Sequence, residues 1–136
     1  MESTTTDTTD TTDSVERALA ARRDIVDITT IGRQTGEARR IEIVFHNLDG
    51  RIYISGMPVG KRRAWLANLE ADPRFTFHLK RTVSADLPAR ARIITDEVER
   101  RTVLAEIIRT AWHDQDLETM IRQSPLIEVM IEQQVA

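Results

Sequence analysis

The sequence predicts one α+β domain built on a six-stranded antiparallel β-barrel, closed or split, with short helices around it. Its 136 residues suit a single domain. Strand-like segments follow one another through short polar turns, which favours antiparallel pairing of neighbours. The helical segments do not alternate regularly with strands, which argues against a parallel βαβ sheet. Six strands with short turns can curl until their edges are protected, and this favours a barrel.

The N-terminal residues 1–13 are expected to form a disordered acidic tail, followed by one domain over 14–136. The stretch STTTDTTDTTDS contains no apolar residue, so it cannot bury enough surface to offset the entropy lost on ordering. The domain then begins with a short helix in SVERALAARRD, where a polar cap precedes Val15, Leu19 and Ala20 on one approximate face.

Three consecutive strands are expected over 24–30, 39–46 and 51–56. DIVDITT and RRIEIVFH are rich in β-branched residues, and GRQTGEAR between them carries two glycines. LDG is a second tight-turn signal before RIYISG. These segments therefore predict a three-stranded meander.

The second half of the chain combines helices with three more strands. Trp65, Leu66 and Leu69 have helical spacing, whereas Phe75, Phe77 and Leu79 alternate with polar residues. The expected elements are helix 61–71, strands 74–83 and 89–95, helices 97–110 and 114–123, and a final strand over 124–132. In the helix capped by Asp96, the residues expected to face inward are Val98, Val103, Leu104 and Ile107.

Composition excludes several kinds of site. The chain has no cysteine, which excludes disulfides, thiolate nucleophiles and iron–sulfur clusters. His46, His78 and His113 form neither an HxH pair nor an HExxH helix, so no metal site is expected. No segment approaches the roughly 18 apolar residues of a membrane helix, and the N-terminus lacks a basic stretch followed by an apolar one. We therefore expect a cytoplasmic protein without stable membrane insertion.

Charge is divided unevenly along the chain. The formal net charge is −3, from 19 basic and 22 acidic residues. Residues 31–81 hold ten bases and five acids, whereas residues 82–136 hold six bases and ten acids. The basic half should attract an anion. Nucleic acid is not expected to be that anion, because aromatic residues are only 4% of the chain and no nucleic-acid-binding motif is present.

Two basic clusters are candidate anion sites. In ITTIGRQTGEARR, Arg33, Arg39 and Arg40 surround a turn whose Gly32 and Gly36 amides could also donate to a phosphate. The alternative is a solvated hairpin tip with ordinary surface arginines. No GKS or GxGxxG sequence accompanies this turn, so it is neither a Walker loop nor a dinucleotide fingerprint.

The second cluster follows the third strand. Ser55 and the glycines after it allow close approach of a ligand to the backbone, and Lys61, Arg62 and Arg63 enter the first turn of the next helix. Basic residues there oppose the helix dipole, which is unusual for a purely structural helix. Trp65 is either a core anchor or a residue that stacks on a ligand.

No arrangement typical of a catalytic nucleophile emerges from the sequence. Ser55, Ser84 and Ser124 lack the GxSxG elbow. If the protein is an enzyme, a bound cofactor should therefore supply the reactive atom. Trp112, His113 and Met120 either line a pocket or belong to the core.

The motifs ITTIGRQTGEARRIEI, RIYISG, KRRAWLANLEADPRFTFHLK and ARARIITDEVERRTVL resemble, in this order, the deazaflavin-dependent nitroreductase and quinone reductase family. The resemblance spans roughly residues 25–110 and the closing strand. It implies a split β-barrel similar to flavin-binding proteins and commonly dimeric. It also implies hydride transfer from reduced coenzyme F420 to a small-molecule acceptor, which would be a quinone, a nitro compound or an enone.

The resemblance also implies roles for individual residues. Arg33 and Arg39 would meet the anionic tail of the cofactor, with Gly32, Thr35 and Gly36 shaping the turn. Ser55 and Gly56 would begin the loop beside the deazaflavin ring. Lys61 would help to hold the phosphate, with added charge from Arg62 and Arg63, and Trp65, Asn68 and Leu69 would support that loop.

Three positions differ from the family pattern. Gln34 stands where the family has a lysine, the loop reads GMPVG, and Arg63 replaces the proline before the tryptophan. An FMN-using protein, or a non-catalytic protein that binds an anionic ligand, remains the alternative function.

Overall fold

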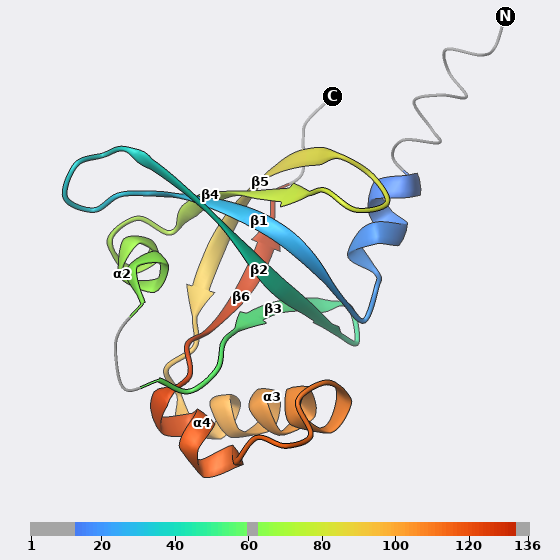
Figure 1. Ribbon diagram of the computed structural model, residues 1–136, viewed down its shortest axis with the longest axis vertical. Helices are drawn as coiled ribbons and strands as arrows, with labels where there is room; N and C mark the ends of the chain where they lie inside the picture. The colour runs from blue at the N-terminus through green and yellow to red at the C-terminus, as the bar shows by residue number, and fades with distance from the viewer. Residues whose placement is uncertain (1–12, 60–62, 133–136) are drawn as a thin grey trace, which may run out of the picture.

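The structure, a computed structural model, describes residues 13–59 and 63–132. Six antiparallel strands close into a barrel in the order β1-β2-β3-β6-β5-β4 (Figure 1), as the sequence predicted. The strands are β1 (Arg23–Ile31), β2 (Ala38–Leu48), β3 (Arg51–Ser55), β4 (Arg74–Leu79), β5 (Ala85–Ile93) and β6 (Leu126–Ile131). Closure pairs β1 with β4 and leaves no free sheet edge between them.

Alternation along the strands fills the barrel. Val26 and Ile28 of β1 point inward and are almost fully buried, and the rings of Phe45 and Phe77 meet edge to face with centroids 5.6 Å apart. Side chains of opposite parity face outward, because successive residues of a strand point to opposite faces. The barrel interior is therefore a packed core, and ligand sites must lie on its outside or at its ends.

Two turns depend on backbone conformations that favour glycine. Asp49 and Gly50 both have positive φ, 54° and 90°, as the two-residue type I′ hairpin between β2 and β3 requires. Gly36, with φ of 76°, performs the same role in the wider β1–β2 turn. Both turns lie where the sequence indicated them.

Helix α2 (Ala64–Ala71) packs beside the barrel, while α3 (Glu97–Thr110) and α4 (Leu117–Gln123) lie together below it (Figure 1). Residues 13–19 form a further helix near β1. None of the described helices combines the length and apolar character needed to cross a membrane.

Helices α3 and α4 cover a second apolar cluster around Tyr53, Leu104 and Met120. Asp96 accepts a hydrogen bond from the Glu99 N–H and so caps α3, as predicted. Asp116 caps α4 in the same way, so that helix begins at Leu117 and not at residue 114.

Several sequence expectations need correction. β4 ends at Leu79, four residues earlier than expected, and β5 begins at Ala85 instead of residue 89. In the barrel, β5 is held between β4 and β6, so Pro88 does not end the strand. Pro88 pairs with Thr76, and its carbonyl accepts a hydrogen bond from the Glu132 N–H. Val98 is 73% exposed and does not face inward, because the buried face of α3 carries Val103, Leu104 and Ile107.

Two predicted segments fall wholly or partly outside the described residues. They are the acidic tail, of which only Asp13 is described, and the first turn of the helix predicted over 61–71, whose described part starts at Ala64.

Candidate functional site

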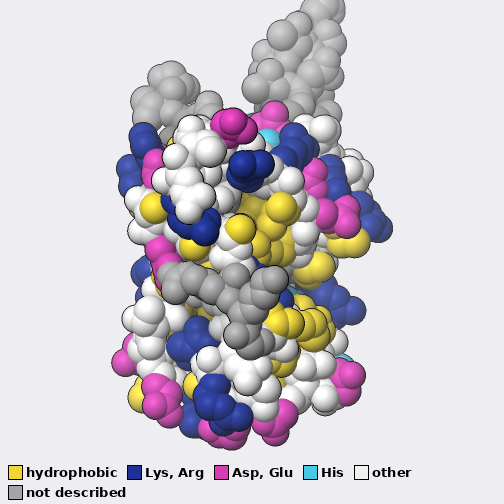
Figure 2. All heavy atoms as spheres, turned by 60° about the vertical axis from the view of Figure 1, so that its left-hand side comes forward, with side chains coloured by type: hydrophobic (Ala, Val, Ile, Leu, Met, Phe, Trp, Pro, Cys, Tyr) yellow, Lys and Arg dark blue, Asp and Glu magenta, His cyan; other side chains and the backbone are white. Residues whose placement is uncertain are grey.

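A groove of about 340 Å³ lies between the β1–β2 turn and α2. On this side of the molecule, basic side chains surround an apolar patch (Figure 2). The groove is lined by Thr30, Gly32, Arg33, Gln34, Thr35, Arg39, Ile41, Ala64, Trp65 and Asn68. Seven of these were named from the sequence: Gly32, Arg33, Gln34, Thr35, Arg39, Trp65 and Asn68.

The β1–β2 turn forms one wall of the groove. The Gly32 N–H donates to the Glu37 carbonyl and the Gly36 N–H to the Gly32 carbonyl, each at 2.8 Å, while the Thr35 hydroxyl accepts from the Glu37 N–H at 3.1 Å. A Cβ at Gly32 would lie only 3.0 Å from the Glu37 carbonyl oxygen, so a side chain there would require this strand of the turn to shift. These contacts fix the turn and bring Arg33 to the groove.

Asn68 of α2 holds Arg33 in place. Its side-chain oxygen accepts from Arg33 twice, from the backbone N–H at 3.2 Å and from Nη1 at 3.0 Å. Its amide donates to the Thr30 hydroxyl at 3.1 Å. Asn68 and Thr30 are both buried. The guanidinium is thus fixed at the rim of the groove and keeps donors for a ligand.

Arg39 reaches the same groove from β2, where it pairs with Thr30 of β1. Within the described chain, neither Arg33 nor Arg39 has a carboxylate within ion-pair distance, whereas the next residue, Arg40, bonds Asp27 at 2.9 Å on the outer face. Uncompensated guanidiniums at the rim of a groove provide charge-assisted donors for an anion.

Trp65 combines the two roles considered from the sequence. It is 8% exposed and belongs to the barrel core, and it also lines the groove beside Ile41 and Ala64. The groove therefore has a basic rim and a partly apolar wall, which suits a ligand with anionic and aromatic parts.

The loop after β3 leads into the N-terminal end of α2, where Ala64 and Trp65 line the groove. The Ser55 hydroxyl is buried and donates to the Pro125 carbonyl at 2.6 Å, so it anchors the loop. Arg63 donates to the Met57 carbonyl at 2.8 Å, and its guanidinium lies 2.9 Å from where a Cβ on Gly56 would stand. Burial lowers the pKa of the Arg63 guanidinium. The remaining basic residues of this cluster, Lys61 and Arg62, lie outside the described residues.

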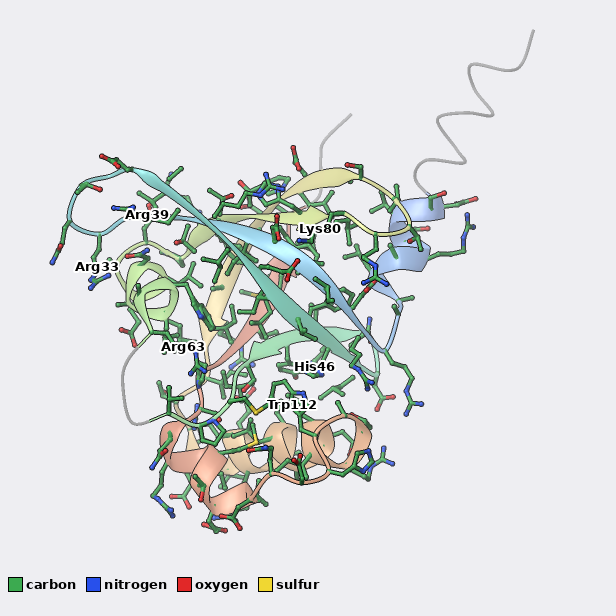
Figure 3. The ribbon with its side chains drawn as sticks, in the orientation of Figure 1. Arg33, Arg39, His46, Arg63, Lys80 and Trp112 are labelled. Carbon is green, nitrogen blue, oxygen red and sulfur yellow. The ribbon has the colours of Figure 1, made fainter. Side chains whose placement is uncertain are left out.

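The other candidates from the sequence lie away from the groove. Met120 is fully buried under α3, and Trp112 packs edge-on against His46 with centroids 4.9 Å apart (Figure 3). His113 is exposed. The sequence did not single out Thr30, Ile41 or Ala64. For Thr30 a signal was available, because alternation along the strand places it on the same face as Val26 and Ile28.

Residues 3–134 match the family described as F420H(2)-dependent quinone reductase. The chain belongs to this family. It is therefore an oxidoreductase that uses coenzyme F420, and the basic rim agrees with an anionic cofactor. No curated protein matches the chain significantly.

Solved structures show the same fold. A pyridoxamine 5′-phosphate oxidase-like protein from Listeria innocua is 15% identical, with a TM-score of 0.64 over 89% of this chain and 93% of the other. An F420-H2-dependent reductase, FDR-A, is 18% identical, with a TM-score of 0.55 over 77% and 92%. A protein described as a domain-swapped dimer is 20% identical, with a TM-score of 0.59 over 90% and 98%. The predicted split-barrel architecture is thus confirmed.

Proposed function

We propose that the groove holds the phosphate and acidic tail of reduced coenzyme F420 and that the enzyme delivers its hydride to a quinone. The observation that carries this proposal is the pair of groove guanidiniums, Arg33 and Arg39, which have no carboxylate partner in the described chain, although Arg40 beside them does. An anionic cofactor would supply the missing counter-charge.

The chain's own residues would bind and orient the cofactor. Gly32, Thr35 and Gly36 shape the turn, and Asn68 fixes Arg33 before the ligand arrives, which reduces the entropy lost on binding. When bound, the deazaflavin supplies the hydride. A quinone can take its proton from solvent, so we assign no catalytic side chain.

The loop after β3 would lie beside the deazaflavin ring. Ser55 anchors this loop to Pro125, and Arg63 at the start of α2 donates to the Met57 carbonyl and packs against Gly56. In keeping with the sequence resemblance, Lys61 would help to hold the phosphate, with added charge from Arg62 and Arg63. Trp65 would contribute apolar surface through its place in the groove wall.

Two further parts of the proposal concern partners. We place quinones first among acceptors because the family is described by them, with nitro compounds and enones as further substrates. We also propose a homodimer, which is supported by the related fold described as a domain-swapped dimer. Analytical ultracentrifugation of the full chain tests this; a monomer at all concentrations would contradict it.

Titration with F420 and, separately, with FMN tests the binding proposal. Arg33→Ala and Arg39→Ala should each weaken F420 binding about tenfold or more, because a hydrogen bond to a charged group contributes about 1.5–3 kcal/mol. Arg40→Ala is the matched control, since Arg40 is already paired with Asp27. High salt should weaken binding to the wild type and affect the two groove variants less.

The same experiment can reject the proposal. Equal F420 affinity in wild type, Arg33→Ala and Arg39→Ala would remove the anion site from this groove. Binding of FMN in place of F420 would contradict the cofactor assignment, and tight F420 binding without quinone reduction would favour a carrier.

A further inference from the structure

Three polar side chains form a connected chain on the outer face of the barrel. Thr29 of β1 lies with its hydroxyl 2.7 Å from Nε2 of His78 on β4. Nδ1 of His78 lies 2.7 Å from a carboxylate oxygen of Asp86 on β5. Strand register produces this alignment, because His78 pairs with Asp86 and Thr29 pairs with Thr76, two residues before His78.

The hydrogen-bonding capacities of these groups assign a role to each. An ionised Asp86 can only accept, so Nδ1 of His78 carries a proton, and in the neutral form of the ring Nε2 accepts from the Thr29 hydroxyl. The bond from His78 lowers the pKa of Asp86 and keeps it ionised. A hydroxyl, a base and a carboxylate that orients the base constitute a nucleophile–base–orienter arrangement.

The surroundings of the triad are charged but largely neutralised. Asp27, opposite His78 in the ladder, is bonded by Lys80 and Arg40, and Lys80 also bonds Glu42. None of these bonds involves Thr29 or His78, so the hydrogen bond between Thr29 and His78 has no competitor among these charged groups.

Access and charge both suit small acyl substrates. His78 is only 7% exposed, but the Asp86 side chain is 74% exposed and Thr29 is half-buried at the surface. Arg40 pairs with Thr29 across the β1–β2 ladder, its side chain is 54% exposed, and its ion pair with Asp27 occupies Nε. The outer nitrogens of Arg40 can donate to an oxyanion that develops beside Thr29.

We propose that Thr29, His78 and Asp86 form a second reactive site, separate from the groove, that hydrolyses small activated carboxylic esters. The Thr29 oxygen attacks the ester carbonyl carbon while its proton passes to Nε2 of His78. The ester C–O bond then breaks, the leaving alcohol takes that proton, and the acyl group remains on Thr29. Water, deprotonated by His78, next attacks the acyl carbon, and the freed Thr29 oxygen regains a proton as the carboxylic acid leaves.

p-Nitrophenyl acetate tests the site in the full chain. The wild type should release p-nitrophenol and carry a transient acetyl group on Thr29, detected by peptide mass spectrometry after acid quenching. Thr29→Val and His78→Gln should each reduce the rate about 100-fold, the lower range of a general-base contribution. Asp86→Asn should also reduce it, because the ring loses its orienting carboxylate.

Thr76→Val is the matched control, since Thr76 lies on the same face and pairs with Thr29; it should keep the wild-type rate. All four variants should keep F420-dependent quinone reduction, which checks the fold. Three results would overturn the proposal: no hydrolysis above background in the wild type, an unchanged rate in Thr29→Val, or acetylation of Lys80 in place of Thr29.

Discussion

Replacing Asn68 with alanine should weaken both the fold and cofactor binding, through one side chain. The amide links α2 to β1 and to the turn, through one hydrogen bond to Thr30 and two from Arg33. Arg33 is exposed and can turn to water, whereas Thr30 is only 1% exposed and its hydroxyl cannot reach water. Leaving a buried polar group without its partner costs about 1–3 kcal/mol, so we expect a loss of about 2 kcal/mol in the free energy of unfolding, measured with urea.

The effect on binding follows from the freedom that Arg33 gains. Immobilising such a side chain costs about 0.5–1.5 kcal/mol, which corresponds to a Kd for F420 raised about 2- to 12-fold in Asn68→Ala. The measurement is isothermal titration at a temperature where both proteins are fully folded, which separates affinity from stability.

A double-mutant cycle isolates this mechanism. If Asn68 acts on the cofactor through Arg33, Asn68→Ala should change the Kd by no more than about twofold in an Arg33→Ala background, within the accuracy to which independent effects add. The reasoning would be refuted if Asn68→Ala weakened binding equally in both backgrounds, because Asn68 would then act on the ligand by another route.

Further substitutions test the fold and the loop. Burial lowers the pKa of His46 to about 4, and the ring regains its ordinary value of 6.5 on unfolding; the unfolded chain therefore binds the extra proton first as the pH falls. This group should remove about 3 kcal/mol of stability between pH 7 and pH 4, and His46→Phe, which can keep the contact with Trp112, should abolish that part of the pH dependence in urea unfolding. Gly36→Ala should cost about 1 kcal/mol because of the positive φ, whereas Gly36→Asn should cost less; equal losses would contradict the conformational explanation. Gly56→Ala should displace the Arg63 guanidinium and lower F420 affinity, with no added effect in an Arg63→Ala background; an additive loss would show that Gly56 acts independently.

Local patterns in the sequence were sufficient for much of the fold. Alternation of Phe75, Phe77 and Leu79, the LDG turn and the Asp96 cap are short-range signals. The start of β4, the β2–β3 turn and the start of α3 lie where they were expected. Boundaries that depend on distant partners were not predictable. The start of β5 at Ala85 and the exposure of Val98 follow from pairing with β4 and from the position of α3 against the barrel.

The sequence by itself determined the barrel class, the basic turn around Arg33 and the family, because each is carried by residues close together in the chain. Only the tertiary structure decided which charges remain uncompensated: Arg39 faces the groove while its neighbour Arg40 meets Asp27, thirteen residues away. The tertiary structure also brought Thr29, His78 and Asp86 together. The sequence motif for a nucleophile, GxSxG, could be applied only to serines and so did not indicate Thr29. The physical reason is that local periodicity shows which face of a strand a residue occupies, whereas the pairing of the strands decides which residue of a neighbouring strand lies opposite it.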